Sequence, residues 1–325
     1  MSSINIRIID RSEDLPDMKS CNFFHSPELF KIIEQTPGSY PYMVIATDEN
    51  GKVVAHMLST LRRRGSWLPP YLYTQGRVYG EGEYDDLNHK EELFGRMLKA
   101  LTHKLDRSLC LFIEFSDISE KMFGYQHFRN NGFFPLLWQE IHNSLHSRKP
   151  EERLCLRTQN IIRKSYKSGI ITREAETVEE VKNFYKMLRG FYRMKLRRLI
   201  PPYQQFLKLS EIDKAKILIT IYKNKIIGGC ACIYSEENAY LWYLASKAKS
   251  HPILHPKTLT VWYAIRYAYE HHYAHISFMD VGLPWKKNPF RNFILSFGGK
   301  PVAKYRWFHF SIPFINQILS WFYRE

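Results

Sequence analysis

The 325-residue sequence has no long uninterrupted apolar run, few cysteines and no apolar segment near its start. No run approaches the roughly 18–20 residues that a membrane-spanning helix needs, so no transmembrane helix is expected. The opening MSSINIRIIDRSEDLPD carries early acids instead of the apolar core of a secretory signal, so secretion is not expected. The five cysteines are an odd and scattered set, typical of small buried side chains in a reducing cytoplasm. We therefore expect a cytoplasmic globular protein.

Acidic residues are scarce in the second half of the chain. Residues 1–148 hold 17 Lys and Arg against 19 Asp and Glu, whereas residues 149–325 hold 30 against 13. The second half therefore carries all of the net positive charge. This asymmetry favours a polyanionic partner, such as a phosphorylated cofactor, RNA or an anionic membrane surface. A merely soluble basic surface is the alternative, because net charge reports first on solubility and steering.

A pattern near the end of each half is repeated. Residues 112–135 read FIEFSDISEKMFGYQHFRNNGFFP and residues 278–301 read FMDVGLPWKKNPFRNFILSFGGKP, and they align without gaps at an offset of 166 residues. The aligned pairs are Phe112 with Phe278, Glu114 with Asp280, Gly132 with Gly298, and Pro135 with Pro301. A strand, helices, a meander, a helix, a strand, a helix and a final strand are predicted in each half. We interpret the chain as a mixed α/β protein with two duplicated domains, residues 1–148 and 149–325.

The ordered segments resemble the FemAB-like acyltransferases, which contain two tandem domains of the GNAT (acyl-CoA N-acyltransferase) fold. The resemblance spans nearly the whole chain and rests on FFHSPELF, RTQNIIRKSYKSG, RRLIPPYQQFLKL, IIGGCACIY, AYLWYLAS, WYAIRYAYEHHYAHISFMDVG and FILSFGGKP. It implies that each domain is a mostly antiparallel twisted sheet flanked by helices. It also implies transfer of an acyl group from acyl-CoA to an amine of a small or lipid-linked cell-envelope precursor or related metabolite. An aminoacyl-tRNA donor, used by some members to extend peptidoglycan peptides, and a non-catalytic binding module of the same fold are the alternatives.

The resemblance places the donor along AYLWYLAS and the loop that follows. Backbone groups of Trp242, Tyr243, Leu244 and Ala245 would hold the acyl arm and the developing oxyanion. The usual GNAT pyrophosphate loop is rich in glycine, whereas SKAKSHPILHPKT has none, so side-chain charge and the start of the next helix would have to hold phosphates. The expected ligands are Lys247, Lys249, His255, Lys257 and Thr258, and a solvated loop is the alternative.

Asp280 is the candidate proton acceptor, because it ends a predicted buried strand at the carboxyl edge of the sheet. A carboxylate that caps the following loop is the alternative. Glu114 occupies the same position of the repeat, and a duplicated position can reflect a structural requirement that both copies share. Tyr243 and Tyr305 are possible acids for the leaving group. The acceptor is expected near Lys195, Arg197 and Arg198, where a solvated helix end is equally consistent with the sequence. No metal is expected, since His271, His272 and His275 lack a carboxylate or cysteine at ligand spacing.

The C-terminal segment YRWFHFSIPFINQILSWFYRE is unusually aromatic. It predicts a helix with an apolar stripe of Phe314, Ile315, Ile318, Leu319 and Phe322, with Trp321 and Tyr323 beside it. Such a helix fits a membrane interface, so peripheral contact with the inner face of the membrane is one hypothesis. Docking on the protein's own surface is the alternative.

Overall fold

A computed structural model describes residues 4–67, 70–85, 88–116, 118, 122–192, 200–279 and 281–323. The chain divides into two compact units, Met1–Trp138 with Lys304–Glu325 and Gln139–Ala303. The end of the chain belongs to the first unit because strand β13 (Lys300–Phe310) pairs antiparallel with β6 (Phe112–Ser116). The two compact units therefore differ from two consecutive halves divided after residue 148.

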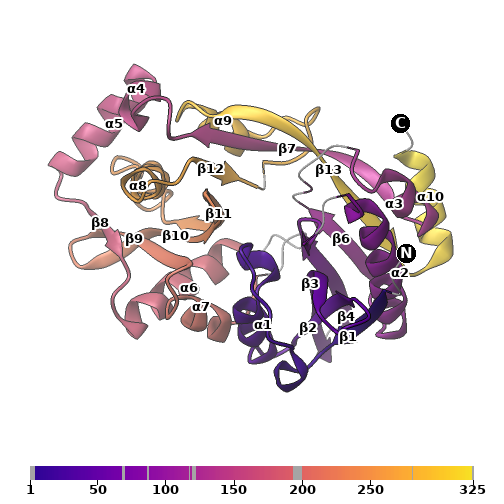
Figure 1. Cartoon of the computed structure of the whole chain (residues 1–325). Helices are drawn as coiled ribbons and strands as arrows, with labels where there is room; N and C mark the ends of the chain where they lie inside the picture. Colours follow the sequence, from indigo (N-terminus) through magenta and orange to yellow (C-terminus); the bar gives the residue numbers. More distant parts are fainter. Residues whose placement is uncertain are drawn as a thin grey trace. The chain divides into compact units, whose positions relative to one another are not determined.

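The first unit contains a mixed sheet in the strand order β1-β2-β3-β4-β6-β13, with β5 paired to β3. Its parallel pair is β4–β6, and the other described pairs are antiparallel. Helices flank the strands (Figure 1). The remaining elements are β1 (Asn5–Ile9), the 3-10 helices η1 (Ser12–Asp14) and η2 (Phe23–His25), α1 (Pro27–Glu34), β2 (Ser39–Thr47), β3 (Val53–Trp67), β4 (Pro70–Tyr79), β5 (Glu83–Tyr84), α2 (Lys90–Arg107), α3 (Tyr125–Asn130) and α10 (Pro313–Phe322).

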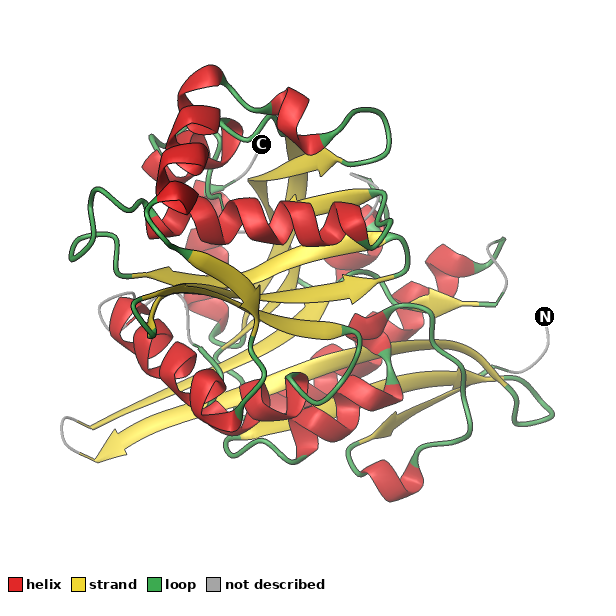
Figure 2. Cartoon of the chain, turned by 90° about the vertical axis from the view of Figure 1, so that its left-hand side faces the viewer, coloured by secondary structure: helices red, strands yellow, loops and turns green. Residues whose placement is uncertain are grey.

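The second unit repeats this plan in the order β7-β12-β11-β10-β9-β8, where β11–β12 is the parallel pair. Helices again lie against the strands (Figure 2). Its elements are β7 (Phe134–Ser144), which begins in the first unit, α4 (Pro150–Arg153), α5 (Leu156–Lys167), β8 (Ile171–Glu174), α6 (Val178–Tyr192), α7 (Tyr203–Leu209), β9 (Ala215–Tyr222), β10 (Lys225–Ser235), β11 (Asn238–Ser246), α8 (Pro256–Glu270), β12 (His275–Phe278) and α9 (Pro289–Leu295). The predicted fold class, a mixed α/β fold of mostly antiparallel strands with flanking helices, is confirmed.

Adjacent glycines let helices approach both faces of β10. A Cβ on Gly228 would lie 2.4 Å from Thr260 Oγ1 of α8, and one on Gly229 would lie 2.6 Å from the Phe184 ring of α6. Because successive residues of a strand face opposite sides of the sheet, the pair admits one helix on each side. The segment IIGGCACIY thereby positions α6 and α8 around the strand next to β11.

The repeated closing pattern has the predicted structure. Helices α3 and α9 each end before a glycine in the left-handed region, Gly132 with φ of 75° and Gly298 with φ of 86°. The strands that follow, residues 134–144 and 300–310, lie at the offset of 166 residues that the alignment gives. The two glycines are therefore equivalent in backbone conformation.

Alanine at these equivalent glycines should have unequal effects. Gly132→Ala is expected to cost about 1–2 kcal/mol, the penalty for an L-residue in the left-handed region, because its Cβ would come no closer than 3.3 Å to its nearest neighbour, the His309 side chain. Gly298→Ala should cost about 1–3 kcal/mol more, since its Cβ would lie 2.5 Å from both Cβ and the carbonyl oxygen of Arg153. Urea unfolding of both variants measures the difference, and equal losses would contradict this reading of the Arg153 contact.

Candidate active site

The parallel pair of the second unit separates partway along β11. Pairing with β12 runs from Asn238 opposite His275 to Leu241 opposite Phe278, and in the described register it goes no further. Beyond that point β11 stays paired with β10 on its other side as far as Ser246. The last part of β11 therefore has one backbone edge that β12 does not fill.

A β-bulge marks the point of separation. Ala231 of β10 lies opposite Tyr243, whereas the next residue, Cys232, lies opposite Leu241, so Trp242 is the extra residue on β11. A bulge bends its strand and redirects the backbone groups beside it. The bulge thus lies where β11 leaves β12.

The described part of the first unit lacks this geometry. There β4 pairs with β6 from Gln75 opposite Phe112 to Tyr79 opposite Ser116, so the pairing reaches the last residue of β4. The register between β3 and β4 also runs without a shift. Only the second unit, within the residues that the structure describes, has a strand edge opened by a bulge.

The predicted donor-binding residues of β11 have buried side chains. Trp242, Tyr243, Leu244 and Ala245 are at most 6% exposed. The Tyr243 ring packs against Phe206 of α7 at 5.4 Å between centroids, while Leu244 joins the apolar cluster beneath α8. These side chains belong to the core, so the chemistry open to this stretch is that of its backbone N–H and C=O groups.

The loop after β11 is largely exposed to solvent and carries the predicted cations. Lys247 and Lys249 are exposed, and the Lys247 N–H donates to the carbonyl of Ile227 (2.8 Å). His255 is exposed and left-handed, with φ of 46°, and its carbonyl accepts from the N–H of Thr258 (2.9 Å). Thr258 itself is buried in the first turn of α8. The geometry brings Lys247 and Lys249 to the end of β11 and His255 to the start of α8.

The ammonium group of Lys257, a predicted phosphate ligand, packs against aromatic rings of α9. Its Nζ lies 4.2 Å from the ring centroid of Phe293 and 4.6 Å from that of Phe290, both on α9. A cation over aromatic faces is stabilised by the ring quadrupoles. Lys257 thus links the first turn of α8 to α9.

A pocket of about 560 Å³ opens beside the end of β11. Among its lining residues, Arg173 is held by Glu180 (Nη1 to Oε2, 3.0 Å). Lys186, Lys225 and Lys247 have no acidic partner in the described part of the chain. The other lining residues are Asn183, Met187, Ile221, Asn224 and Ile226. The pocket is therefore electropositive and suited to an anionic group.

Sequence reasoning found only Lys247 among the pocket cations. Lys225 follows the tight turn at Lys223 and Asn224, both with positive φ, which brings it to the same end of the sheet as Lys247. Lys186 lies on α6, and Glu180 and Asn183 of the same helix also line the pocket. Their spacing of three residues puts all three on one face of α6, and this polar face could have been recognised in the sequence.

The remaining predicted residues do not line this pocket or lie outside the described residues. Asp280, Lys195, Arg197 and Arg198 fall in the latter group, although both neighbours of Asp280, Met279 and Val281, are buried. Tyr305 lies on β13 in the apolar cluster of the first unit, 6% exposed, with its ring centroid 6.3 Å from that of Trp307.

Glu114, which aligns with Asp280 in the repeat, has a structural role. Its carboxylate accepts from Arg306 Nη1 of β13 (3.0 Å) and from Gln75 Nε2 of β4 (2.8 Å), and Arg77 Nη2 lies 3.4 Å away. The Arg306 guanidinium also stacks over Trp138 at 4.1 Å. The buried carboxylate thus ties β6 to the strands on both of its sides.

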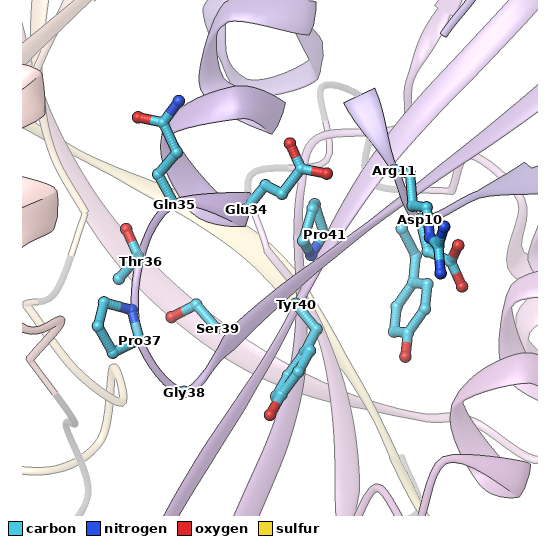
Figure 3. A pocket seen from close by; sticks show the side chains of 11 residues that line it. Asp10, Arg11, Glu34, Gln35, Thr36, Pro37, Gly38, Ser39, Tyr40 and Pro41 are labelled. Carbon is cyan, nitrogen blue, oxygen red and sulfur yellow. The ribbon is translucent and has the colours of Figure 1, made fainter. Parts of the chain in front are cut away.

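The first unit contains a larger pocket, of about 730 Å³, at the end of α1 and the start of β2 (Figure 3). No predicted site residue lines it. Its charged lining residues are Asp10, Glu34 and Arg11; Asp10 pairs with Lys104 (3.1 Å), and Glu34 Oε1 accepts from the N–H of Ser12 (2.9 Å). This balance does not favour a polyanionic ligand.

Comparison with solved structures supports the tandem arrangement. The chain is similar to FemX (12% identity, 93% of this chain and 94% of that one, TM-score 0.62) and to L-PGS from Bacillus licheniformis (12%, 92% of each, TM-score 0.58). It is also similar to a tandem GNAT protein from the clavulanic acid biosynthesis pathway (9%, 95% and 99%, TM-score 0.59). No family model and no curated protein matches the sequence. The chain therefore has the tandem GNAT fold of the FemAB-like proteins.

Proposed function

We propose that this protein is an acyltransferase whose second unit binds the acyl donor and passes the acyl group to an amine. The observation that carries the proposal is the opened edge of β11, where the bulge at Trp242 coincides with the end of β11–β12 pairing. An extended ligand can pair along a strand edge where the neighbouring strand ends, as an added strand does. A donor arm with amide groups suits such pairing.

The chemistry follows from this placement. The amine nitrogen attacks the acyl carbonyl, and the negative charge that develops on the carbonyl oxygen needs preorganised donors. Backbone N–H groups of residues 243–245 are the candidates in this unit. The amine must lose a proton, for which Asp280 remains the proposed acceptor. The leaving group can take its proton from water, because the side chains of Tyr243 and Tyr305 are buried.

Acyl-CoA is the donor that fits the electropositive pocket best. Its phosphates would lie near Lys186, Lys225 and Lys247, beyond the end of β11, while the acyl arm follows the strand toward Trp242. Lys249 in the loop after β11, and His255 and Thr258 at the start of α8, would add further contacts. The acceptor, an amine of a cell-envelope precursor or a related metabolite, would approach from Lys195, Arg197 and Arg198.

A thermal-shift measurement tests donor binding. Acetyl-CoA or longer acyl-CoAs should raise the melting temperature, because a ligand that binds only the native state stabilises it. Lys225→Glu with Lys247→Glu should weaken binding by at least about tenfold, or about 1.4 kcal/mol. Lys31→Glu with Lys99→Glu, the matched reversal of exposed lysines in the first unit, should leave binding unchanged. Absence of any shift with acyl-CoAs would refute this donor.

Helix α5 favours a second candidate, an aminoacyl-tRNA donor. Arg157, Arg163, Lys164 and Lys167 are exposed on this helix, which contains no acidic residue. Such a face can contact a phosphate backbone, and its binding would weaken steeply with salt. Steep salt-dependent tRNA binding without an acyl-CoA shift would select this donor. Failure of both ligands would leave a non-catalytic binding module of the same fold.

A further inference from the structure

Helix α10 is attached to the first unit without burying any of its own residues. Asn316 accepts from the N–H of Phe310 (2.9 Å) and donates to the carbonyl of Gly132 (2.8 Å), just after α3. Tyr323 stacks on Phe134 with ring centroids 6.1 Å apart. Figure 1 shows α10 beside α3. The helix is thus fixed through Asn316 and the Tyr323 ring.

The opposite side of α10 presents large apolar side chains to solvent. Phe314, Trp321 and Phe322 are 71%, 64% and 69% exposed, and Ile315 and Ile318 are 37% and 39% exposed. Their spacing places them along one stripe of the helix. The segment from Ser311 to Tyr323 contains no charged residue. Single exposed apolar residues are ordinary, whereas a contiguous aromatic stripe marks an interaction surface.

The size of this surface favours a lipid surface over a second protein. A helix of ten residues is about 15 Å long and about 10 Å across, so it covers roughly 150 Å². A stable protein interface needs about 800 Å² from each partner. A membrane interface has no such minimum, because each aromatic ring that enters it contributes separately.

The charged residues beside α10 suit an anionic surface. Asp106 is occupied: it accepts from Ser311 Oγ (2.8 Å) and lies 3.6 Å from His309 Nε2. Arg107, next to Asp106 on α2, and Arg129 of α3, three residues before Gly132, have no acidic partner within the described residues. Basic side chains near an anionic membrane surface strengthen binding to it.

We propose that α10 lies in the headgroup region of an anionic membrane, with Phe314, Trp321 and Phe322 inserted and Arg107 and Arg129 facing the headgroups. Trp and Tyr rings suit this region because they combine an apolar body with a polar edge. Asn316 and Tyr323 hold the helix to the first unit on its other side. This inference does not depend on the reaction proposed above.

Flotation of the full chain with vesicles tests the inference. The wild type should float with vesicles of phosphatidylglycerol and phosphatidylcholine, and less with phosphatidylcholine alone. Phe314→Ser, Trp321→Ser and Phe322→Ser combined should lower partitioning at least about tenfold. Leu72→Ser, Leu156→Ser and Ile171→Ser, at positions 64%, 77% and 58% exposed elsewhere, form the matched control and should float like the wild type.

Failure of the wild type to float would overturn the proposal, and so would equal flotation of the α10 variant and the control variant. Equal binding to both kinds of vesicle would remove the role of the two arginines. Sedimentation equilibrium tests whether a second copy of the chain covers this surface instead. A dimeric wild type and a monomeric α10 variant, with neither floating, would assign the surface to a second copy and overturn the proposal.

Discussion

Glu114→Ala is expected to lower the free energy of unfolding by about 3–5 kcal/mol, since it removes one partner from a buried ionic cluster. Glu114 and Arg306 are 6% and 4% exposed, and the carboxylate is within 3.4 Å of both Arg306 and Arg77. Without the carboxylate, the guanidinium groups lose a counter-charge that water cannot replace at this depth. Urea unfolding measures the loss.

Two further variants make this expectation specific. Glu13→Ala, at an exposed acid, should change stability by no more than about 0.5 kcal/mol. Glu114→Ala combined with Arg306→Met should cost less than the sum of the single substitutions, because the second removes a charge that the first leaves uncompensated. Strict additivity, or a loss from Glu114→Ala as small as that from Glu13→Ala, would show that the cluster does not stabilise the sheet.

Asp280→Asn is expected to lower turnover by about 10²–10⁴-fold while donor affinity stays nearly intact. The amide cannot accept the proton of the attacking amine, yet it conserves the size of the side chain. The prediction rests on the sequence position of Asp280 after the buried strand β12, since the residue lies outside the described residues. Donor affinity from thermal shift and turnover with an amine acceptor are the two measurements.

The aligned residue of the repeat supplies the contrast. Glu114→Gln should reduce stability with little change in turnover per folded molecule, because its carboxylate is engaged with Arg306 and Gln75. If Asp280→Asn instead reduces stability and leaves turnover unchanged, Asp280 has the structural role of its counterpart and no part in catalysis.

The fold was predictable because its signals are local. Ser26 followed by Pro27 is a helix-start signal, and in the structure the N–H of Leu29 donates to Ser26 Oγ (3.1 Å). The spacing of Leu93, Met97 and Leu101 predicts the buried stripe of α2, and all of them are buried. Cys230 and Cys232, two residues apart on β10, lie in the core with their sulfur atoms 3.8 Å apart.

The parts that sequence reasoning missed depend on contacts between distant segments. The pairing of β13 with β6 joins residues almost 200 positions apart, and nothing in KYRWFHF distinguishes it from a strand of the second unit. The bulge at Trp242 is a register shift between two strands, whereas AYLWYLAS alone reads as a regular strand. Lys186 and Lys225 become neighbours of Lys247 only when α6 and the β9–β10 turn meet beside β11.

Hydrogen exchange of the full chain, with and without a saturating acyl-CoA, tests the central claim that the opened edge of β11 binds the donor. The account predicts slower exchange in residues 242–246 and at the start of α8, and unchanged exchange in β4, the corresponding strand of the first unit. Protection of β4 without protection of residues 242–246 would contradict the account.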